Sequence, residues 1–243
     1  LSFRKIISLL QTVLLYYIFV YITTFSLQYH LLSPKIHDNM ISIFNNLFYI
    51  ISRSIFMIRI GIVSYNIYCN FTNYGSALQS WALYQSIKRI SPDLYQPVLV
   101  DYCPDSLSDK DPLNPFSNMW DQDPESRKMC ELSLPAIRIN YQKFDHFYHT
   151  YFGLTSQKYT SENFNSIAHF DDINHFVCDS DTIFCINEFN GFDDGYFANY
   201  DVMKGNSVSY AASFGDAHFD TDSYQILNNR LQNFLAIGLR ENK

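Results

Sequence analysis

Small and polar residues gather at three points of the chain, each at the end of a strand-like run: residues 66–75, 179–182 and 210–215. A carboxylate such as Asp179 or Asp181 can act as a general base or bind the hydroxyls of a sugar. In a simpler interpretation, one of these aspartates caps the next helical turn. The three segments therefore predict a binding site only if the fold brings them to one edge.

The other reactive residue types give weaker signals. The five cysteines (positions 69, 103, 130, 178 and 185) form no C-x-x-C pair, which favours reduced thiols in a cytosolic protein over disulfides or zinc ligands. His146 and His149 are spaced to share one helix face, and we predict no metal site from that spacing alone. G-x-G-x-x-G, Walker A, G-x-S-x-G and H-E-x-x-H motifs are missing, so we predict no cofactor.

The charge balance disfavours nucleic acid as a partner. The 243-residue chain has a formal net charge of −7 and no Lys/Arg run longer than a pair. The charge is also uneven: residues 1–56 carry four basic residues and one acidic residue, whereas residues 57–243 carry thirteen and twenty-three. This difference predicts a boundary at Met57.

Residues 1–56 form an apolar, helix-like N-terminal extension with two open interpretations. The run 6–25 has no charged residue and is long enough to be a membrane anchor. Alternatively, the extension is upstream read-through, with Met57 as the natural start. We favour the second interpretation, and we expect a cytoplasmic protein that meets the inner face of the membrane only if 6–25 is a true anchor.

Strand-like and helix-like segments alternate from Met57 onward. The strand-like segments are 58–65, 97–101, 173–179, 206–213 and 236–240. The helix-like segments are 75–90, 125–152 with an interruption near Pro135, 161–169 capped by Ser161, and 222–235. This alternation predicts an α/β fold: a Rossmann-like parallel sheet with helices on both faces.

Two further segments have mainly structural interpretations. The acidic, Pro-rich residues 103–124 predict a solvated loop rather than a calcium site. One stripe of the predicted helix 125–152 should be buried in the core. Tyr210 should also be a packing residue rather than a catalytic one. The stripe consists of Leu134, Ile137, Tyr141, Phe144, Tyr148 and Tyr151.

In a parallel sheet the carboxyl ends of the strands meet at one edge, where ligands bind. The three polar segments should therefore converge there, and Gln79 lies one helical turn inside the first of them. Small residues at that edge allow close approach of a ligand, and helix N-termini attract anions.

At these residues the chain resembles the polysaccharide pyruvyl transferase family. The matching segments stand in the family order: Met57 with 61–65, 73–79, Ser180-Asp181, 209–215 and 238–241. The resemblance implies two Rossmann-like domains facing across a cleft, as in GT-B-type glycosyltransferases. It also implies transfer of the enolpyruvyl group of phosphoenolpyruvate to two sugar hydroxyls, which forms a cyclic ketal and releases phosphate.

The resemblance further implies which half of the site is present. In the family the basic and histidine residues linked to phosphoenolpyruvate belong to the second domain, so we expect 57–243 to be the truncated amino-terminal, acceptor-side domain. Its partners would be phosphoenolpyruvate and a glycan or lipid-linked sugar acceptor. Asp179 departs from the family pattern, which has glycine there.

We predict Asp181 as the catalytic base or hydroxyl ligand. The predicted substrate-binding residues are Asn73, Tyr74, Gly75, Gln79, Ser180, Ser213 and Gly215. Two alternatives remain open: a GT-B-like sugar-nucleotide glycosyltransferase, and a non-catalytic glycan-binding or truncated domain.

Overall fold

The computed structural model describes residues 57–65, 73–108, 111, 113 and 123–241, together with 13, 16–21, 23–24, 39, 41–43 and 45–46. The chain separates into two compact units, Leu1–Ile58 and Arg59–Lys243. The described residues up to position 46 are all helical. Within the described residues, no helix combines the length and the apolar character needed to cross a bilayer. Most of segment 6–25, and much of the 103–124 loop, lie outside the described residues.

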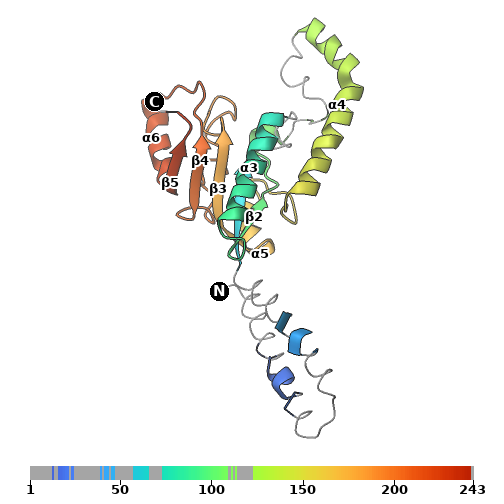
Figure 1. Cartoon of the computed structure of the whole chain (residues 1–243). Helices are drawn as coiled ribbons and strands as arrows, with labels where there is room; N and C mark the ends of the chain where they lie inside the picture. Colours follow the sequence, from blue (N-terminus) through green and yellow to red (C-terminus); the bar gives the residue numbers. More distant parts are fainter. Residues whose placement is uncertain are drawn as a thin grey trace. The chain divides into compact units, whose positions relative to one another are not determined.

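The second unit is a five-stranded parallel sheet with helices (Figure 1). Its strands are β1 (Ile58–Ser64), β2 (Tyr95–Leu99), β3 (Ile173–Asp181), β4 (Ser207–Ala212) and β5 (Phe234–Leu239). Its helices are α3 (Tyr74–Ile90), α4 (Pro124–Tyr151), α5 (Ile167–Phe170) and α6 (Thr221–Leu231), with 3-10 turns η1 (Asp105–Leu107) and η2 (Phe164–Ser166). The strand order is β2-β1-β3-β4-β5, which confirms the predicted α/β class and parallel sheet.

The alternation of side chains along the strands divides the core into two apolar clusters. Ile62, Leu99 and Val177 face α3 and α4, and pack with Leu83 and Phe144. Their strand neighbours point to the other face, where they pack with residues of α5, α6 and the 182–206 segment; these neighbours are Val63, Val98, Val100, Phe176 and Cys178. Successive strand residues point to opposite faces of a sheet, so central strands that are apolar throughout need cover on both faces.

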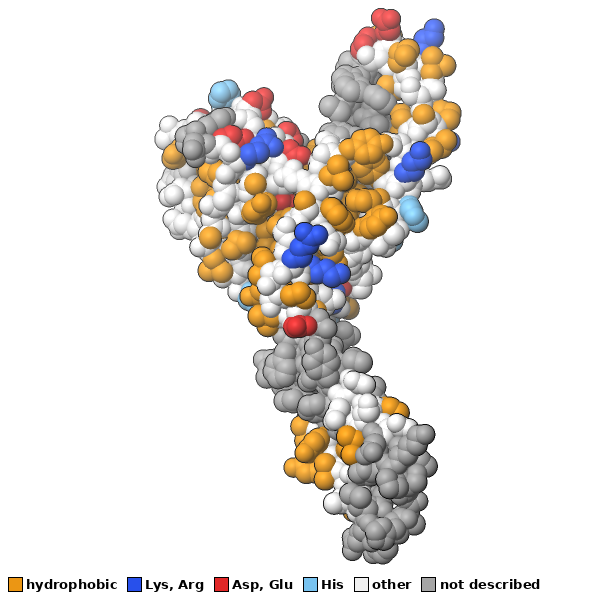
Figure 2. Space-filling view, in the orientation of Figure 1, with side chains coloured by type: hydrophobic (Ala, Val, Ile, Leu, Met, Phe, Trp, Pro, Cys, Tyr) orange, Lys and Arg blue, Asp and Glu red, His pale blue; other side chains and the backbone are white. Residues whose placement is uncertain are grey.

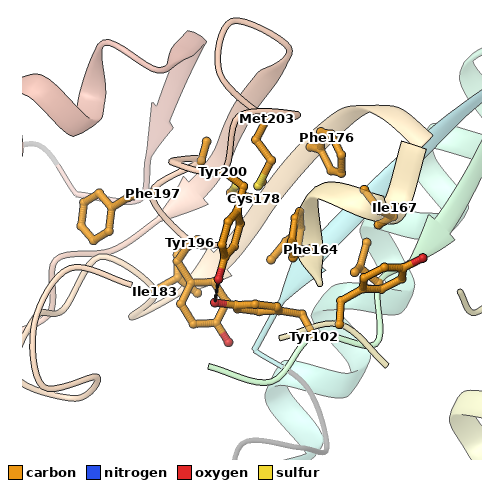
Figure 3. Close-up of a cluster of buried hydrophobic side chains, with 14 of the residues drawn as sticks. Tyr102, Phe164, Ile167, Phe176, Cys178, Ile183, Tyr196, Phe197, Tyr200 and Met203 are labelled. Atoms are coloured by element: carbon orange, nitrogen blue, oxygen red, sulfur yellow. Dashed lines mark hydrogen bonds between the residues drawn. The ribbon is translucent and has the colours of Figure 1, made fainter. Parts of the chain in front are cut away.

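The second cluster is rich in aromatic rings (Figure 3). Tyr102 lies edge-on to Phe164 and Tyr196, with ring centroids 5.4 and 5.7 Å away, and Phe164 stacks on Tyr200 at 4.3 Å. The Tyr102 and Tyr200 hydroxyls are 3.3 Å apart. These rings, with the segment 182–206, fill the face of the sheet opposite α3.

The long helix α4 continues through Pro135, so the predicted interruption there is wrong. Asp123 caps the helix, and Pro124 occupies its first turn, where a missing N–H costs nothing. Of the predicted stripe, Phe144 and Tyr148 are buried, whereas Tyr151 is 54% exposed. Only Tyr141, Phe144 and Tyr148 of that stripe pack in the core.

The predicted and observed element boundaries differ most at the short helices. The expected helix 161–169 is the 3-10 turn η2 followed by the single turn α5, and Asn163, not Ser161, precedes it as N-cap residue. The Asn163 side chain accepts a hydrogen bond from the Thr160 N–H at 2.8 Å. The predicted helix 222–235 ends at Leu231, because Phe234 already begins β5 against Ser207 of β4.

Candidate functional site

The second and third polar segments, 179–182 and 210–215, lie at the carboxyl ends of the parallel strands β3 and β4 and therefore at the same edge of the sheet. Residues 66–72 of the first segment lie outside the described residues, and its last residues, 73–75, begin α3. Strand β1 is followed along the chain by the edge strand β2, but it pairs with β3 on its other side. Successive strands are therefore added to one side of β1 (β2) and then to its other side (β3, β4 and β5). In this doubly wound order, ligands bind at the switch point between β1 and β3. The carboxyl ends of β1 and β3 carry Ser64 and the residues 179–181.

A cluster of serines and aspartates occupies this switch point. We name it the serine–aspartate cluster; it consists of Ser64, Ser76, Ser80, Asp179, Ser180 and Asp181. The Ser76 hydroxyl donates to Asp181 Oδ2 at 2.8 Å, and Ser64 and Ser80 share a hydrogen bond of 2.5 Å. Ser64 donates to Asp179 Oδ2 at 3.3 Å and Ser180 donates to Asp179 Oδ1 at 2.7 Å. Side chains from β1, β3 and α3 thus meet at one point.

Asp179 is completely buried in this cluster. Burial raises the pKa of its carboxyl to about 6. The surrounding serine hydroxyls reduce this rise, whereas the negative charge of Asp181 adds to it. The hydroxyls lower the pKa because they donate to the charged form. Asp179 is therefore the buried support of the cluster, out of reach of solvent.

Asp181 is the aspartate that reaches the surface. It is half-buried, and its Oδ1 accepts the Thr182 N–H at 3.0 Å. Its backbone φ is +71°, a left-handed conformation that costs a non-glycine residue energy and is found preferentially at functional sites. Neither aspartate is an N-cap of a helix, so the capping interpretation does not account for this pair.

The third polar segment, 210–215, contacts Asp181 by a backbone hydrogen bond. The Ser213 N–H donates to the Asp181 carbonyl at 2.8 Å, and a Cβ added to Gly215 would come within 3.2 Å of Thr182 Cγ2. The Ser213 side chain is buried and bonds Glu241, and it accepts the Gly215 N–H at 3.0 Å. Ser213 and Gly215 therefore shape the edge without presenting a side chain to it.

The residues at the start of α3 divide between two roles. Asn73 is the N-cap: its Oδ1 accepts the N–H groups of Gly75 at 2.8 Å and Ser76 at 3.3 Å, which places Ser76 against Asp181. Tyr74 instead turns to α4, where its hydroxyl donates to Asn140 at 3.1 Å. Gln79 is half-buried one turn further along.

Sequence reasoning named Ser180 but missed the other three serines of the cluster, and it misjudged Tyr210. Ser64, Ser76 and Ser80 are isolated serines in apolar segments, and only Ser76, in the first turn of a capped helix, carried a usable signal. Tyr210 is 54% exposed rather than packed.

Metal-binding groups do not assemble in the part of the chain described. No group of three or more His, Cys, Asp or Glu residues is placed to hold an ion there. His149 Nδ1 lies 3.4 Å from Asp145, and His146 lies next to Thr150. The described cysteines 103, 130, 178 and 185 are free and buried, and Cys69 lies outside the described residues.

Comparison of the chain with models of known protein families, with curated proteins and with solved structures gives no match. The fold and site define a class: a doubly wound α/β unit with a serine–aspartate cluster at its switch point. No cation contacts the cluster among the residues that the structure describes, and carboxylates and hydroxyls alone suit a neutral, hydroxyl-rich ligand better than an anion.

Proposed function

We propose that the chain belongs to a transferase of the pyruvyl type and binds its sugar acceptor at the serine–aspartate cluster. The enolpyruvyl group of phosphoenolpyruvate would be moved to two hydroxyls of the sugar, in cell-surface polysaccharide biosynthesis. The observation that supports this most is the hydrogen bond from Ser76 of α3 to Asp181 of β3. It holds a half-buried carboxylate at the switch point.

In this proposal Asp181 removes a proton from a sugar hydroxyl. The hydroxyl oxygen then bonds to C2 of the enol phosphate, and C3 accepts the proton that Asp181 removed. The oxygen of the second hydroxyl bonds to the same C2, the bond from C2 to the phosphate oxygen breaks, and phosphate leaves with the proton of the second hydroxyl. Ser76 holds the Asp181 carboxylate in place, and the N-terminus of α3 favours its negative charge.

The donor phosphate needs cations, and the cluster supplies none among the described residues. Two carboxylates would repel a phosphate rather than bind it. The proposal therefore assigns only the acceptor to this edge, and assigns phosphoenolpyruvate to basic residues elsewhere, as the family resemblance implies.

The test is release of phosphate from phosphoenolpyruvate by the full-length protein, with and without a panel of free and lipid-linked oligosaccharides. We expect acceptor-dependent release, a ketal product by mass spectrometry, and a rate at least about 100-fold lower for Asp181→Asn. The matched control is Asp201→Asn, an exposed aspartate paired with Lys204, which should keep the full rate.

Two other outcomes would contradict the proposal. Release of a nucleotide from a sugar nucleotide, with phosphoenolpyruvate unused, would identify a glycosyltransferase. Saturable binding of a glycan with no transfer from either donor would identify a non-catalytic binding domain.

A further inference from the structure

A polar pocket lies at the carboxyl edge of the sheet, on the face opposite α3. It has a volume of about 180 Å³, and its lining includes Asp105, Ser106, Phe189, Phe192, Asp193 and Asp194. Tyr65, which directly follows β1, packs edge-on against Phe189 at 5.7 Å and so places the pocket at the end of β1. Figure 2 shows acidic side chains at this edge of the sheet. The pocket is separate from the serine–aspartate cluster, because Phe189 belongs to the apolar cluster on the other face.

The protein itself holds part of the lining in a fixed position. Both Asp193 oxygens accept the Tyr102 hydroxyl at 3.0 Å, and Oδ1 also accepts two backbone N–H groups. Asn190 and Gly191 of the lining have φ values of +57° and +129°, and the Gly191 N–H donates to the Ile186 carbonyl at 2.8 Å. These contacts form the pocket without a ligand, and Asp193 contributes negative charge to it.

The pocket carries more negative than positive charge. Asp105 is exposed, and within the described part of the chain its carboxylate makes no hydrogen bond or ion pair. Asp194 Oδ1 is bonded to Arg230 and accepts the Asn199 amide at 3.1 Å, whereas its Oδ2 accepts no donor among the described residues. One cation therefore pairs with a set of three carboxylates, and a cationic ligand would reduce the excess of negative charge.

Ser106 is the residue that points to a ligand atom. Its Oγ is buried and has no hydrogen-bond partner among the residues that the structure describes, although Ser106 lines the pocket beside Asp105. Buried hydroxyls are nearly always hydrogen-bonded, because an unpaired one has lost water without a replacement. A polar atom of a bound molecule would supply the partner that Ser106 lacks.

We propose that the pocket binds a primary ammonium compound, a small molecule with an –NH₃⁺ group on a short carbon chain. The ammonium has three N–H donors, and the pocket offers three acceptors: the Asp105 carboxylate, Asp194 Oδ2 and Ser106 Oγ. The rings of Phe189 and Phe192 line the carbon chain and attract the charge.

A bare metal ion fits this pocket less well. Among the described residues, no group of three or more carboxylates, histidines or cysteines is placed to hold one. The inference is independent of the proposed pyruvyl transfer, because it concerns a different pocket and needs no reaction to test it.

The test is an NMR titration of the full-length chain with n-butylammonium chloride at pH 7 and constant ionic strength. We expect saturable shifts of the backbone amides of Ser106 and Gly191. Tetramethylammonium, which has the charge but no N–H donor, should bind at least about fivefold more weakly. The alcohol n-butanol, which lacks the charge, should cause no saturable shift.

Substitutions test which side chains make the contacts. Asp105→Asn should weaken binding about tenfold because a charged acceptor is lost, and Ser106→Ala about threefold because a neutral one is lost. The matched control is Asp145→Asn, which makes the same change of charge at an aspartate of α4 that pairs with His149 outside the pocket. It should change the affinity less than about twofold. The amide spectrum of each variant shows whether it is folded.

Four results would overturn the inference. Shifts that never saturate, or that avoid Ser106 and Gly191, would show that the pocket is not the site. Equal weakening by Asp105→Asn and Asp145→Asn would show attraction to the overall charge alone. Equal affinity for tetramethylammonium would exclude the three hydrogen bonds. Displacement of n-butylammonium by micromolar Ca²⁺, dependent on Asp105, would assign the pocket to a metal ion instead.

Discussion

Asp179 and Asp193 are two carboxyls of the same unit, and burial raises the pKa of each to about 6. Their surroundings differ. Asp193 accepts the Tyr102 hydroxyl at 3.0 Å and the N–H groups of Gly195 and Tyr196 at 3.0 and 2.9 Å. Asp179 instead accepts hydroxyls of serines on β1 and β3.

The difference separates a structural carboxylate from one linked to a candidate site. The partners of Asp193 are two amides of its own turn and a core tyrosine, so it fastens the 182–206 segment to the aromatic cluster. The serines around Asp179 connect it to α3, whose Ser76 contacts the half-buried Asp181. A raised pKa alone does not distinguish these roles; the origin of the hydrogen-bond donors does.

The largest predicted effect concerns the pH dependence of stability at Asp179. An aspartate titrates near 3.9 in the unfolded chain and at about 6 here, so between these values the folded chain binds more protons. Stability is therefore lost as the pH rises from about 4 to 6, at a cost of about 3 kcal/mol. Asp179→Asn lacks that titration, so it should gain about 3 kcal/mol relative to the unsubstituted chain between pH 4 and pH 7.

This prediction is checked by urea unfolding at closely spaced pH values. The contribution of Asp193 is present in both proteins and cancels. Parallel stability curves for the two proteins would show that Asp179 does not titrate between pH 4 and pH 7. Asp179 and Asp193 could then no longer be compared as two carboxyls with a raised pKa.

The second prediction concerns Asp193. Asp193→Ala should lower the free energy of unfolding by about 2 kcal/mol, because the buried Tyr102 hydroxyl and two N–H groups lose their acceptor. Asp193→Asn, which keeps one carbonyl oxygen, should lose less. Chemical unfolding at pH 7 measures both, with the exposed Asp201→Ala as control. Equal losses at positions 193 and 201 would contradict the structural role.

The third prediction concerns the hydroxyls beside Asp179. Ser64→Ala should lower stability by about 1 kcal/mol and raise the pKa of Asp179 further, because a donor to the charged form is lost. The carboxyl carbon shift of Asp179 in an NMR titration reports that pKa. Ser86→Ala, at an exposed serine that bonds only its own helix, should leave it unchanged. A lowered pKa in Ser64→Ala would mean that the serine does not donate to Asp179.

The smallest predicted effect concerns backbone strain at Ala211, which, like Asp181, is a non-glycine residue with a positive φ. Ala211 in β4 has a φ of +51°, and its side chain has no part in the proposed site. Ala211→Gly should raise stability by about 0.5 kcal/mol, since glycine adopts this conformation without strain. In the phosphate-release assay it should keep its rate, whereas Asp181→Gly should lose it. Thermal unfolding provides the stability measurement, and a destabilised Ala211→Gly would show that the conformation carries no strain.

Much of the fold was predictable because its signals are local. The apolar strand β1, the Asn73 cap and the good helix formers of α3 each specify their own element, and their alternation specifies a parallel sheet. The short η2–α5 segment was misjudged because packing against the sheet, rather than helix propensity, determines its form.

The candidate site was predictable only in part. The strand-end position of Asp181 follows from parallel strands, and Asp181 was predicted on that basis together with the family resemblance. The contact between Ser76 and Asp181 joins residues 105 positions apart, and the burial of Asp179 depends on serines from other elements. Neither the contact nor the burial produces a periodic pattern in the sequence, so neither could be predicted from it.

The sequence by itself determined the α/β class, the strands and the edge at which polar residues collect, because hydrophobic periodicity and capping act over a few residues. The tertiary structure alone decided the order β2-β1-β3-β4-β5, the different environments of Asp179 and Asp181, and the polar pocket that Asp105 and Asp194 line. Those features depend on which elements pack together, and packing is a property of side chains that meet only after the chain has folded.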